Sequence, residues 1–217
     1  MFQTDILFGI PVYKTRIDPS LYDKEKLLST INKNYSIGPR NKHNYYNSTM
    51  HMSLYDEGKD PKFENMDYTK LSRVYNDVFW DFVRKLKLDF NGKINLDYEI
   101  AQYTVLKKDD WMGYHNHLPD SDFACVHYLQ LNKDIGTKIK NTHSFSDYYR
   151  YMRPDMYKHM DKEHTINSYA FNDFTLGVAE DDMIIFPTVA DHGIKKIDTT
   201  SDKLRITIAT NLKLNFS

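Results

Sequence analysis

The sequence predicts a mainly β fold, an antiparallel sandwich or barrel with flanking helices, and two observations lead to this prediction. The first is a strongly amphipathic helix after Asp67, which needs a sheet to cover. The second is a change from helical to alternating hydrophobic periodicity near residue 94, followed by several short apolar segments. Helices first and many short strands afterwards are typical of a β core that helices support.

Length and composition exclude several other classes. The chain has 217 residues, is 41% hydrophobic and carries a formal net charge of −1, as expected for a globular protein with a sizeable core. It has no general basic footprint for nucleic acid, and no apolar run approaches the length of a membrane span. The single cysteine, Cys125, excludes an intrachain disulfide and indicates a reducing compartment such as the cytoplasm. Without repeats or linkers, we expect one domain over residues 1–217.

The first third of the chain is expected to support the core. Residues 6–13 predict a short strand interrupted by Gly and Pro, and Ser20 is a candidate N-cap for a following helix. Residues 36–66 show no period and are expected to be irregular. We therefore expect helical support over about residues 18–90. The clearest helix carries apolar residues at steps of three and four: Leu71, Val74, Tyr75, Val78, Phe79, Phe82 and Leu86.

Residues 94–214 are expected to form the β core. From Ile94 to Leu106, alternate residues should share one face of a strand, with Ala101, Tyr103 and Val105 on the other face. The polar and aromatic insert at about residues 132–167 is too long for a hairpin turn, so we expect a lid or binding loop, or else a loosely attached decoration. Further strands are predicted over residues 123–131, 169–176, 183–187, 192–197 and 204–214.

Two histidines form the first informative site. On an extended backbone, residues two apart point to the same side, so the imidazoles of His115 and His117 can converge on one point. Neutral imidazoles are common ligands of iron, manganese, zinc, nickel and copper. The spacing alone is a weak signal, because two histidines this close also occur by chance.

A third histidine follows an apolar strand that ends at Pro187. In a jelly roll, His192 would lie near the start of the next strand, where it would complete a set of three ligands. The competing interpretation is a turn histidine that is hydrogen-bonded beside Asp191.

The last predicted strand alternates cleanly. Arg205, Thr207, Ala209 and Asn211 face one way, opposite the apolar residues between them. An arginine fork with a hydroxyl two residues on suits bidentate binding of a carboxylate. The competing interpretation is the polar, solvent-facing side of an edge strand.

The order of these sites resembles the Fe(II)- and 2-oxoglutarate-dependent oxygenases, and most closely the small phage-type oxygenases related to prolyl 4-hydroxylases. The resemblance covers about residues 98–212, and the opening residues 7–12 look similar more weakly. The matching positions are an aromatic strand residue, a histidine pair, a Tyr-Leu strand, an apolar Phe-Pro strand, a distal histidine and an Arg-x-Thr. They are Tyr103, His115-Asn116-His117, Tyr128-Leu129, Ile185-Phe186-Pro187, His192 and Arg205-Ile206-Thr207.

The resemblance implies a double-stranded β-helix, or jelly-roll, core with Fe(II) at its mouth and O2 and 2-oxoglutarate as cosubstrates. It implies three metal ligands, His115, His117 and His192. Arg205 would pair with the far carboxylate of 2-oxoglutarate, helped by Thr207 and Tyr103. The expected reaction is hydroxylation of an unactivated C–H bond with release of succinate and CO2. For a phage-encoded protein, the compartment would be the host cytoplasm.

Position 117 departs from the family pattern, which has Asp or Glu there. Either all three ligands are histidines, or Asp120 or Asp122 swings inward and replaces one of them, leaving that histidine outside the ligand set.

Two other functions remain open at this point. A cupin-like metalloenzyme would use the histidines with Asp122 but would not use 2-oxoglutarate, and it leaves Arg205 unexplained. A non-enzymatic jelly-roll protein, such as a phage structural or binding module, would hold no stoichiometric metal. The primary substrate, a small molecule or a protein side chain, and the oligomeric state are not specified by the sequence.

Overall fold

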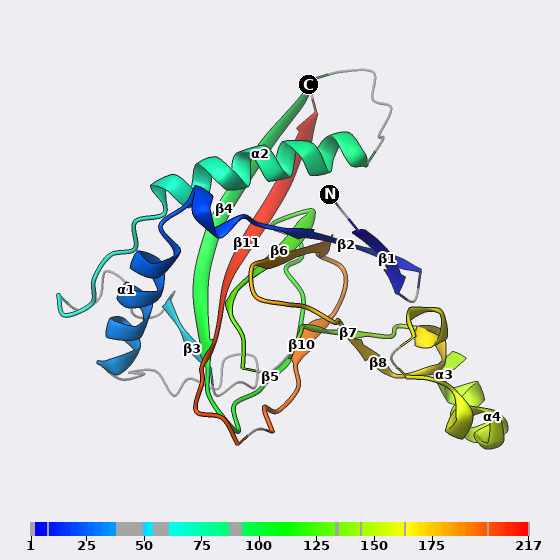
Figure 1. The fold of residues 1–217 in the computed structure, drawn as a ribbon. Coiled ribbons are helices and arrows are strands. Elements are labelled where there is room, and N and C mark those ends of the chain that lie inside the picture. The colour runs from blue at the N-terminus through cyan, green and yellow to red at the C-terminus, as the bar shows by residue number, and fades with distance from the viewer. Residues whose placement is uncertain are drawn as a thin grey trace.

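A computed structural model describes residues 3–7, 9–37, 50–53, 61–86, 93–132, 135–143, 145–162, 164–198 and 200–216. Two antiparallel sheets face each other, and helices cover the outer face of the larger one (Figure 1). The predicted mainly β class with a jelly-roll core and flanking helices is confirmed. Phe8 and most of the segment 36–66 lie outside the described residues.

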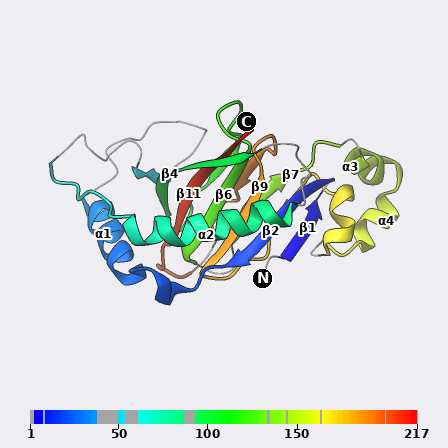
Figure 2. The ribbon, with the colours of Figure 1, turned by 90° about the horizontal axis from the view of Figure 1, so that it is seen from above.

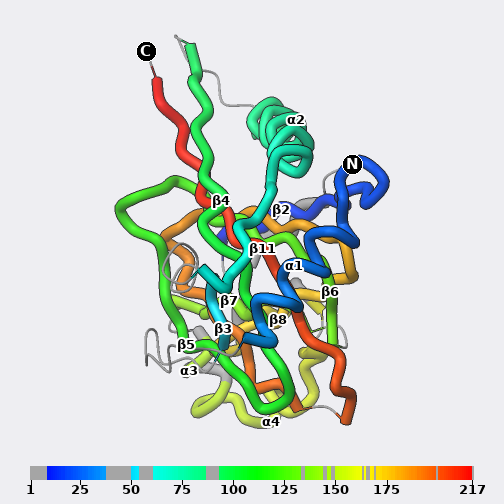
Figure 3. The backbone as a smooth tube through the Cα atoms, turned by 90° about the vertical axis from the view of Figure 1, so that its left-hand side faces the viewer, coloured from blue at the N-terminus to red at the C-terminus, as the bar shows by residue number. Residues whose placement is uncertain are grey.

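The larger sheet has seven strands in the order β1-β2-β9-β6-β11-β4-β3. Each neighbouring pair is antiparallel. β4 and the end of β11 extend together beyond the other strands (Figure 3). The strands are β1 (Gln3–Leu7), β2 (Ile10–Arg16), β3 (His51–Met52), β4 (Ile94–Leu106), β6 (Phe123–Gln130), β9 (Asp182–Pro187) and β11 (Arg205–Phe216).

The smaller sheet has four strands in the order β5-β10-β7-β8. Its members are β5 (Met112–His115), β10 (His192–Ile194), β7 (Lys138–Lys140) and β8 (Asp173–Thr175). These strands have three or four residues each, which is too short for a periodicity of two to stand out in the sequence. The β5 and β7 strands were accordingly not predicted, and the strand predicted over 192–197 ends at Ile194.

Helix α2 (Thr69–Lys85) lies across the larger sheet on the face turned away from the smaller one (Figure 2). The predicted apolar stripe is confirmed, because its buried residues pack into one cluster with side chains of β4, β6, β9 and β11. Burying each such side chain contributes roughly 1.5–3 kcal/mol to folding. The buried residues of α2 are Leu71, Tyr75, Phe79, Phe82 and Val83.

The other N-terminal helix begins later than predicted. Ser20 lies inside a short 3₁₀ helix, η1 (Pro19–Leu21), whose N-cap is Asp18, and α1 (Lys24–Ser36) follows. The Asp18 carboxylate accepts hydrogen bonds from both the backbone N–H and the hydroxyl of Ser20. The N-cap position of α1 is Asp23, whose side chain makes no capping hydrogen bond, so Ser20 does not cap the predicted helix.

The predicted face assignment of β4 is wrong along half of the strand. Thr210 of β11 pairs with Ile100, and Ala209 pairs with Gln102. Ala101 of β4 therefore has no pairing residue on β11. Such a β-bulge exchanges the two faces of a strand. Before Ala101 the even-numbered apolar residues pack on the helix side, and after it Tyr103 does so instead.

The segment at residues 132–167 forms part of the smaller sheet as well as the predicted insert. It supplies β7 to the smaller sheet and then forms α3 (Phe145–Asp147), the π-helical η4 (Tyr148–Met152), α4 (Pro154–His159) and the start of η5 (Thr165–Ala170). The strand predicted over 169–176 is reduced to β8, because its first residues belong to η5. Among the helices in the ranges given above, none is both long enough and apolar enough to cross a membrane.

Candidate functional site

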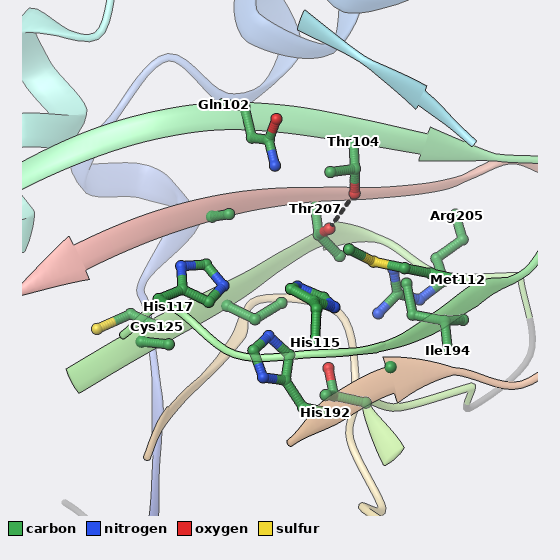
Figure 4. A pocket seen from close by; sticks show the side chains of 15 residues that line it. Gln102, Thr104, Met112, His115, His117, Cys125, His192, Ile194, Arg205 and Thr207 are labelled. Atoms are coloured by element: carbon green, nitrogen blue, oxygen red, sulfur yellow. Dashed lines mark hydrogen bonds between the residues drawn. The ribbon is translucent and has the colours of Figure 1, made fainter. Parts of the chain in front are cut away.

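Three histidines converge at one end of the space between the sheets. One ring nitrogen each from His115, His117 and His192 lies within 4.8 Å of the others. The ring centroids are 4.2 Å apart for His115 and His192, and 5.1 Å apart for His117 and His192. Figure 4 shows the three rings pointing toward one another. The structure thus brings together the three histidines that the sequence singled out.

The hydrogen bonds of these rings favour one of the two neutral tautomers. Nδ1 of His115 lies 3.2 Å from the carbonyl oxygen of Gly113, and Nδ1 of His192 lies 3.0 Å from that of Ala190. A carbonyl oxygen can only accept, so these contacts favour the tautomer in which Nδ1 carries the proton and Nε2 carries a lone pair. Nδ1 of His117 lies 2.8 Å from Oδ1 of Asn211, an acceptor of the same kind. The contacts of all three rings therefore favour the form that can bind a metal through Nε2.

Burial also favours the neutral form of the rings. It lowers the pKa of His115 to about 4, lowers that of His117 and lowers that of His192 well below the usual range. In each case the main cause is the loss of hydration by the charged imidazolium. The rings are thus neutral at pH 7, as metal ligands must be.

Strand pairing places two of the histidines. His192, at the start of β10, is in register with His115, at the end of β5. Gly193 permits this pairing, because a Cβ there would lie 2.7 Å from the carbonyl oxygen of Met112 and 3.0 Å from that of Gly113. The glycine after the distal histidine is therefore part of the site, since any side chain would separate β10 from β5.

The third histidine lies in the loop after β5, and Asp122 anchors that loop. The backbone N–H of Asp122 donates to the carbonyl of Leu212, and its carboxylate accepts the backbone N–H of Leu214. Thr188, in the loop before β10, donates its hydroxyl to the carbonyl of Ser121. Asp120 and Asp122 are both exposed, and neither belongs to the cluster of potential ligands. Of the two alternatives left open by the sequence, the geometry favours three histidines.

Arg205 lies at the other end of the same narrow cavity, at the start of β11. Its side chain is completely buried. Nε donates to the carbonyl of Ile135 at 3.0 Å, and the guanidinium lies 5.2 Å from the centre of the Tyr128 ring. Nη1 and Nη2 are buried and have no hydrogen-bond partner within the described part of the chain. Two forked donors are thus left for a ligand.

The charge of Arg205 is not balanced by an acidic side chain among the described residues of the cavity wall. Burial lowers the pKa of Arg205, yet a guanidinium stays protonated in proteins. Among the described residues that line the cavity, none is acidic. A buried charge without an acidic partner among the described residues is costly, so this end of the cavity suits an anion.

Threonine hydroxyl groups line the same cavity as Arg205. Oγ1 of Thr207 lies 2.7 Å from Oγ1 of Thr104 on the neighbouring strand, and Thr137 also lines the cavity. Thr207 therefore lies on the Arg205 face, and the face assignment of β11 is confirmed. Thr104 and Gln102 were not recognised in the sequence, because the bulge at Ala101 turns them toward the cavity (Figure 4).

Tyr103 does not line this cavity. Its side chain is fully buried on the opposite face of β4, in the cluster beneath α2. The same bulge is the reason, since it exchanges the positions of Tyr103 and Thr104 relative to the predicted alternation. The structure therefore does not bring Tyr103 together with Arg205 and Thr207.

The similarity of this chain to known proteins lies in its fold. No protein-family model and no curated protein matches the sequence. Among solved structures, a prolyl-4-hydroxylase from Pseudomonas putida matches with 7% identity and a TM-score of 0.54, covering 93% of this chain and 91% of its own.

Two further matches have lower TM-scores. A viral collagen prolyl hydroxylase from Paramecium Bursaria Chlorella virus-1, in complex with 2-oxoglutarate, has 11% identity and a TM-score of 0.45, over 92% and 94% of the two chains. HygX from Streptomyces hygroscopicus, with nickel and 2-oxoglutarate bound, has 11% identity and a TM-score of 0.42, over 92% and 82%. The chain thus shares its fold with the prolyl-4-hydroxylase of Pseudomonas putida.

Proposed function

We propose that this protein is an Fe(II)- and 2-oxoglutarate-dependent oxygenase that hydroxylates an unactivated C–H bond. One observation carries the proposal: a buried arginine, with two donors that have no hydrogen-bond partner among the described residues, shares a cavity with three convergent, neutral histidines. A metal site alone would not need Arg205, and an anion site alone would not need the histidines. The fold shared with a prolyl-4-hydroxylase supports the same function.

The histidine cluster fits a divalent transition metal. Imidazole nitrogen suits iron, nickel, copper and zinc, and three neutral ligands on one side would leave coordination positions open toward the cavity. His115, His117 and His192 would hold the ion. Fe(II) and 2-oxoglutarate supply the oxidation chemistry when bound, with O2 as the oxidant and succinate and CO2 as products.

Arg205 would select and orient the diacid. Its two free donors match the two oxygens of a carboxylate, and such charge-assisted, bidentate pairs are among the strongest hydrogen bonds in proteins. The hydroxyl groups of Thr207 and Thr104 lie on the same wall and can donate to the carboxylate. The dianion would in turn balance the arginine charge and part of the metal charge.

The walls between the two ends of the cavity are mostly apolar. Met112, Ile194, Val126 and Ala209 line them. Such walls restrict water and strengthen electrostatic interactions between the ligands and the polar groups at either end.

Anaerobic titration of the Fe(II)-loaded protein with 2-oxoglutarate tests the proposal. We expect a metal-to-ligand charge-transfer band that saturates at one equivalent. In Arg205→Met, which keeps much of the side-chain volume, we expect iron binding to persist and 2-oxoglutarate affinity to fall at least about 30-fold, from the loss of a buried charged pair. Arg84→Ala removes an exposed arginine on α2 and is the matched control.

Two results would overturn the proposal. Protein that holds iron but shows no band would indicate a metalloenzyme that does not use 2-oxoglutarate, such as a cupin-like enzyme. Protein that holds no metal would leave the histidines as structural residues and remove the basis for an enzyme.

A further inference from the structure

His117 differs from the other two histidines in how its ring is held. His115 and His192 each donate from Nδ1 to the carbonyl two residues earlier in their own chain segment. His117 instead points to the side chain of Asn211, which lies 94 positions away on β11 of the opposite sheet. It is also the one of the three that lies outside a strand. Its ring orientation therefore depends on a contact between the two sheets.

We infer that Asn211 is a positioning residue that fixes the tautomer and the orientation of His117 in the metal site. This inference rests on the proposed function, because it assigns His117 the role of a ligand. Oδ1 of Asn211 accepts from Nδ1 of His117 at 2.8 Å, which leaves the Nε2 lone pair directed at the cluster.

The same hydrogen bond accounts for a histidine at the position where the family pattern has a carboxylate. A carboxylate ligand needs donors around its second oxygen, whereas an imidazole ligand needs an acceptor at its other nitrogen. Asn211 lies on the same face of β11 as Arg205, Thr207 and Ala209, which line the cavity. One face of this strand thus serves both ends of the cavity: Arg205 holds the anion and Asn211 orients a ligand.

The tautomer of His117 can be measured without any metal. In ¹H–¹⁵N spectra of the apo protein that resolve the ring nitrogens, we expect His117 to be protonated at Nδ1. In Asn211→Leu, which has nearly the same shape but no acceptor, we expect a shift toward the Nε2–H form that predominates in unconstrained imidazoles. An unchanged tautomer in this variant would overturn the inference.

Metal affinity gives the second readout. Replacing a residue that orients a metal ligand typically weakens binding by about 10- to 100-fold, so we expect that loss of Co(II) affinity in Asn211→Leu, with a changed visible spectrum of the Co(II) protein. Asn211→Asp keeps the acceptor and should bind Co(II) at least as tightly as the wild type. Asn215→Leu, at the exposed end of the same strand, removes a hydrogen bond to Asp97 and should leave affinity unchanged.

The outcomes separate this inference from the proposed function. If the wild type binds one Co(II) and Asn211→Leu binds it equally well, the inference that Asn211 positions His117 is wrong, whereas the proposed function stands. Equal loss in the Leu and Asp variants would also contradict it, because the acceptor would then not matter. If the wild type binds no metal, the proposed function fails, while the tautomer measurement still reports on the hydrogen bond.

Discussion

A buried histidine lies on each side of the larger sheet, yet only one of the two belongs to the candidate site. His127 faces α2, where its Nδ1 lies 2.8 Å from the hydroxyl of Tyr75, and its ring has aromatic neighbours. His192 faces the space between the sheets and has two other histidines around it. Burial lowers the pKa of both residues.

The difference shows that burial and a lowered pKa do not by themselves identify a metal ligand. A candidate metal ligand is indicated when the lone pairs of several residues can meet at one point. His127 is a hydrogen-bonded core residue, as its position on the same face as Cys125 and Leu129 predicts. Cys125 is likewise a buried free thiol in that cluster, and burial raises its pKa. The helix face therefore contributes stability, and the cavity face carries the candidate site.

The largest expected effect is on the helix face. Phe79 is completely buried in the cluster between α2 and the sheet, so Phe79→Ala should lower the free energy of unfolding by about 3–5 kcal/mol. Urea denaturation of the apo protein measures it. The folded variant should bind metal as the wild type does, and a loss of metal affinity without a loss of stability would contradict the division between the faces.

The next largest effect is expected from substitutions of the two buried histidines, His192 and His127. His192→Gln should weaken Co(II) binding by more than about 100-fold, because it removes a proposed ligand rather than a residue proposed to orient one. His127→Gln should leave Co(II) affinity within about twofold of the wild type, since that ring lies on the other face. Calorimetric titration measures both affinities. Equal effects in the two variants would contradict the different roles assigned to His192 and His127.

The pH dependence of the free energy of unfolding tests the burial of His127 on the helix face. Burial lowers the pKa of His127 to about 3, while in the unfolded chain it is about 6.5. Below that value the unfolded state takes up a proton that the folded state does not. His127 therefore costs stability as the pH falls from about 6.5 to about 3, by up to about 1.4 kcal/mol per pH unit.

His127→Gln should remove this contribution. Urea denaturation of the apo variant between pH 4 and 7 should show a flatter dependence of unfolding free energy on pH. His159→Gln, which alters an exposed histidine in α4, is the control and should keep the wild-type slope. If the His127→Gln variant keeps that slope as well, the burial argument for His127 is wrong.

The smallest effects concern the two aspartates near His117. Asp120→Asn and Asp122→Asn should leave the metal stoichiometry and affinity unchanged, because both side chains lie outside the histidine cluster. Asp122→Asn should lower stability by about 1 kcal/mol, because it weakens the hydrogen bond from the backbone N–H of Leu214. A loss of metal in either variant would restore the carboxylate-containing ligand set.

The sequence predicts what depends on uninterrupted local patterns. The stripe of α2 and the alternation of β11 are regular over their whole length, so the faces of Phe79 and Arg205 follow directly. The proximity of His115 and His117 follows from their spacing, and His192 joins them through the jelly-roll topology.

The remaining features depend on contacts that local patterns do not record. The bulge at Ala101 exchanges Tyr103 with Thr104, and no Gly or Pro marks it in the sequence. Asn211 contacts a residue 94 positions away, and only the packing of the two sheets brings them together. The β5 and β7 strands owe their conformation to pairing with β10 rather than to their own sequence.

We expect the three histidines and Arg205 to hold a metal and a diacid in one cavity. A crystal structure of the protein prepared anaerobically with Mn(II) and 2-oxoglutarate would test this directly. It should show Mn(II) within bonding distance of Nε2 of all three histidines, with one carboxylate of the diacid on Nη1 and Nη2 of Arg205. A metal bound elsewhere, or a diacid that does not contact Arg205, would contradict it.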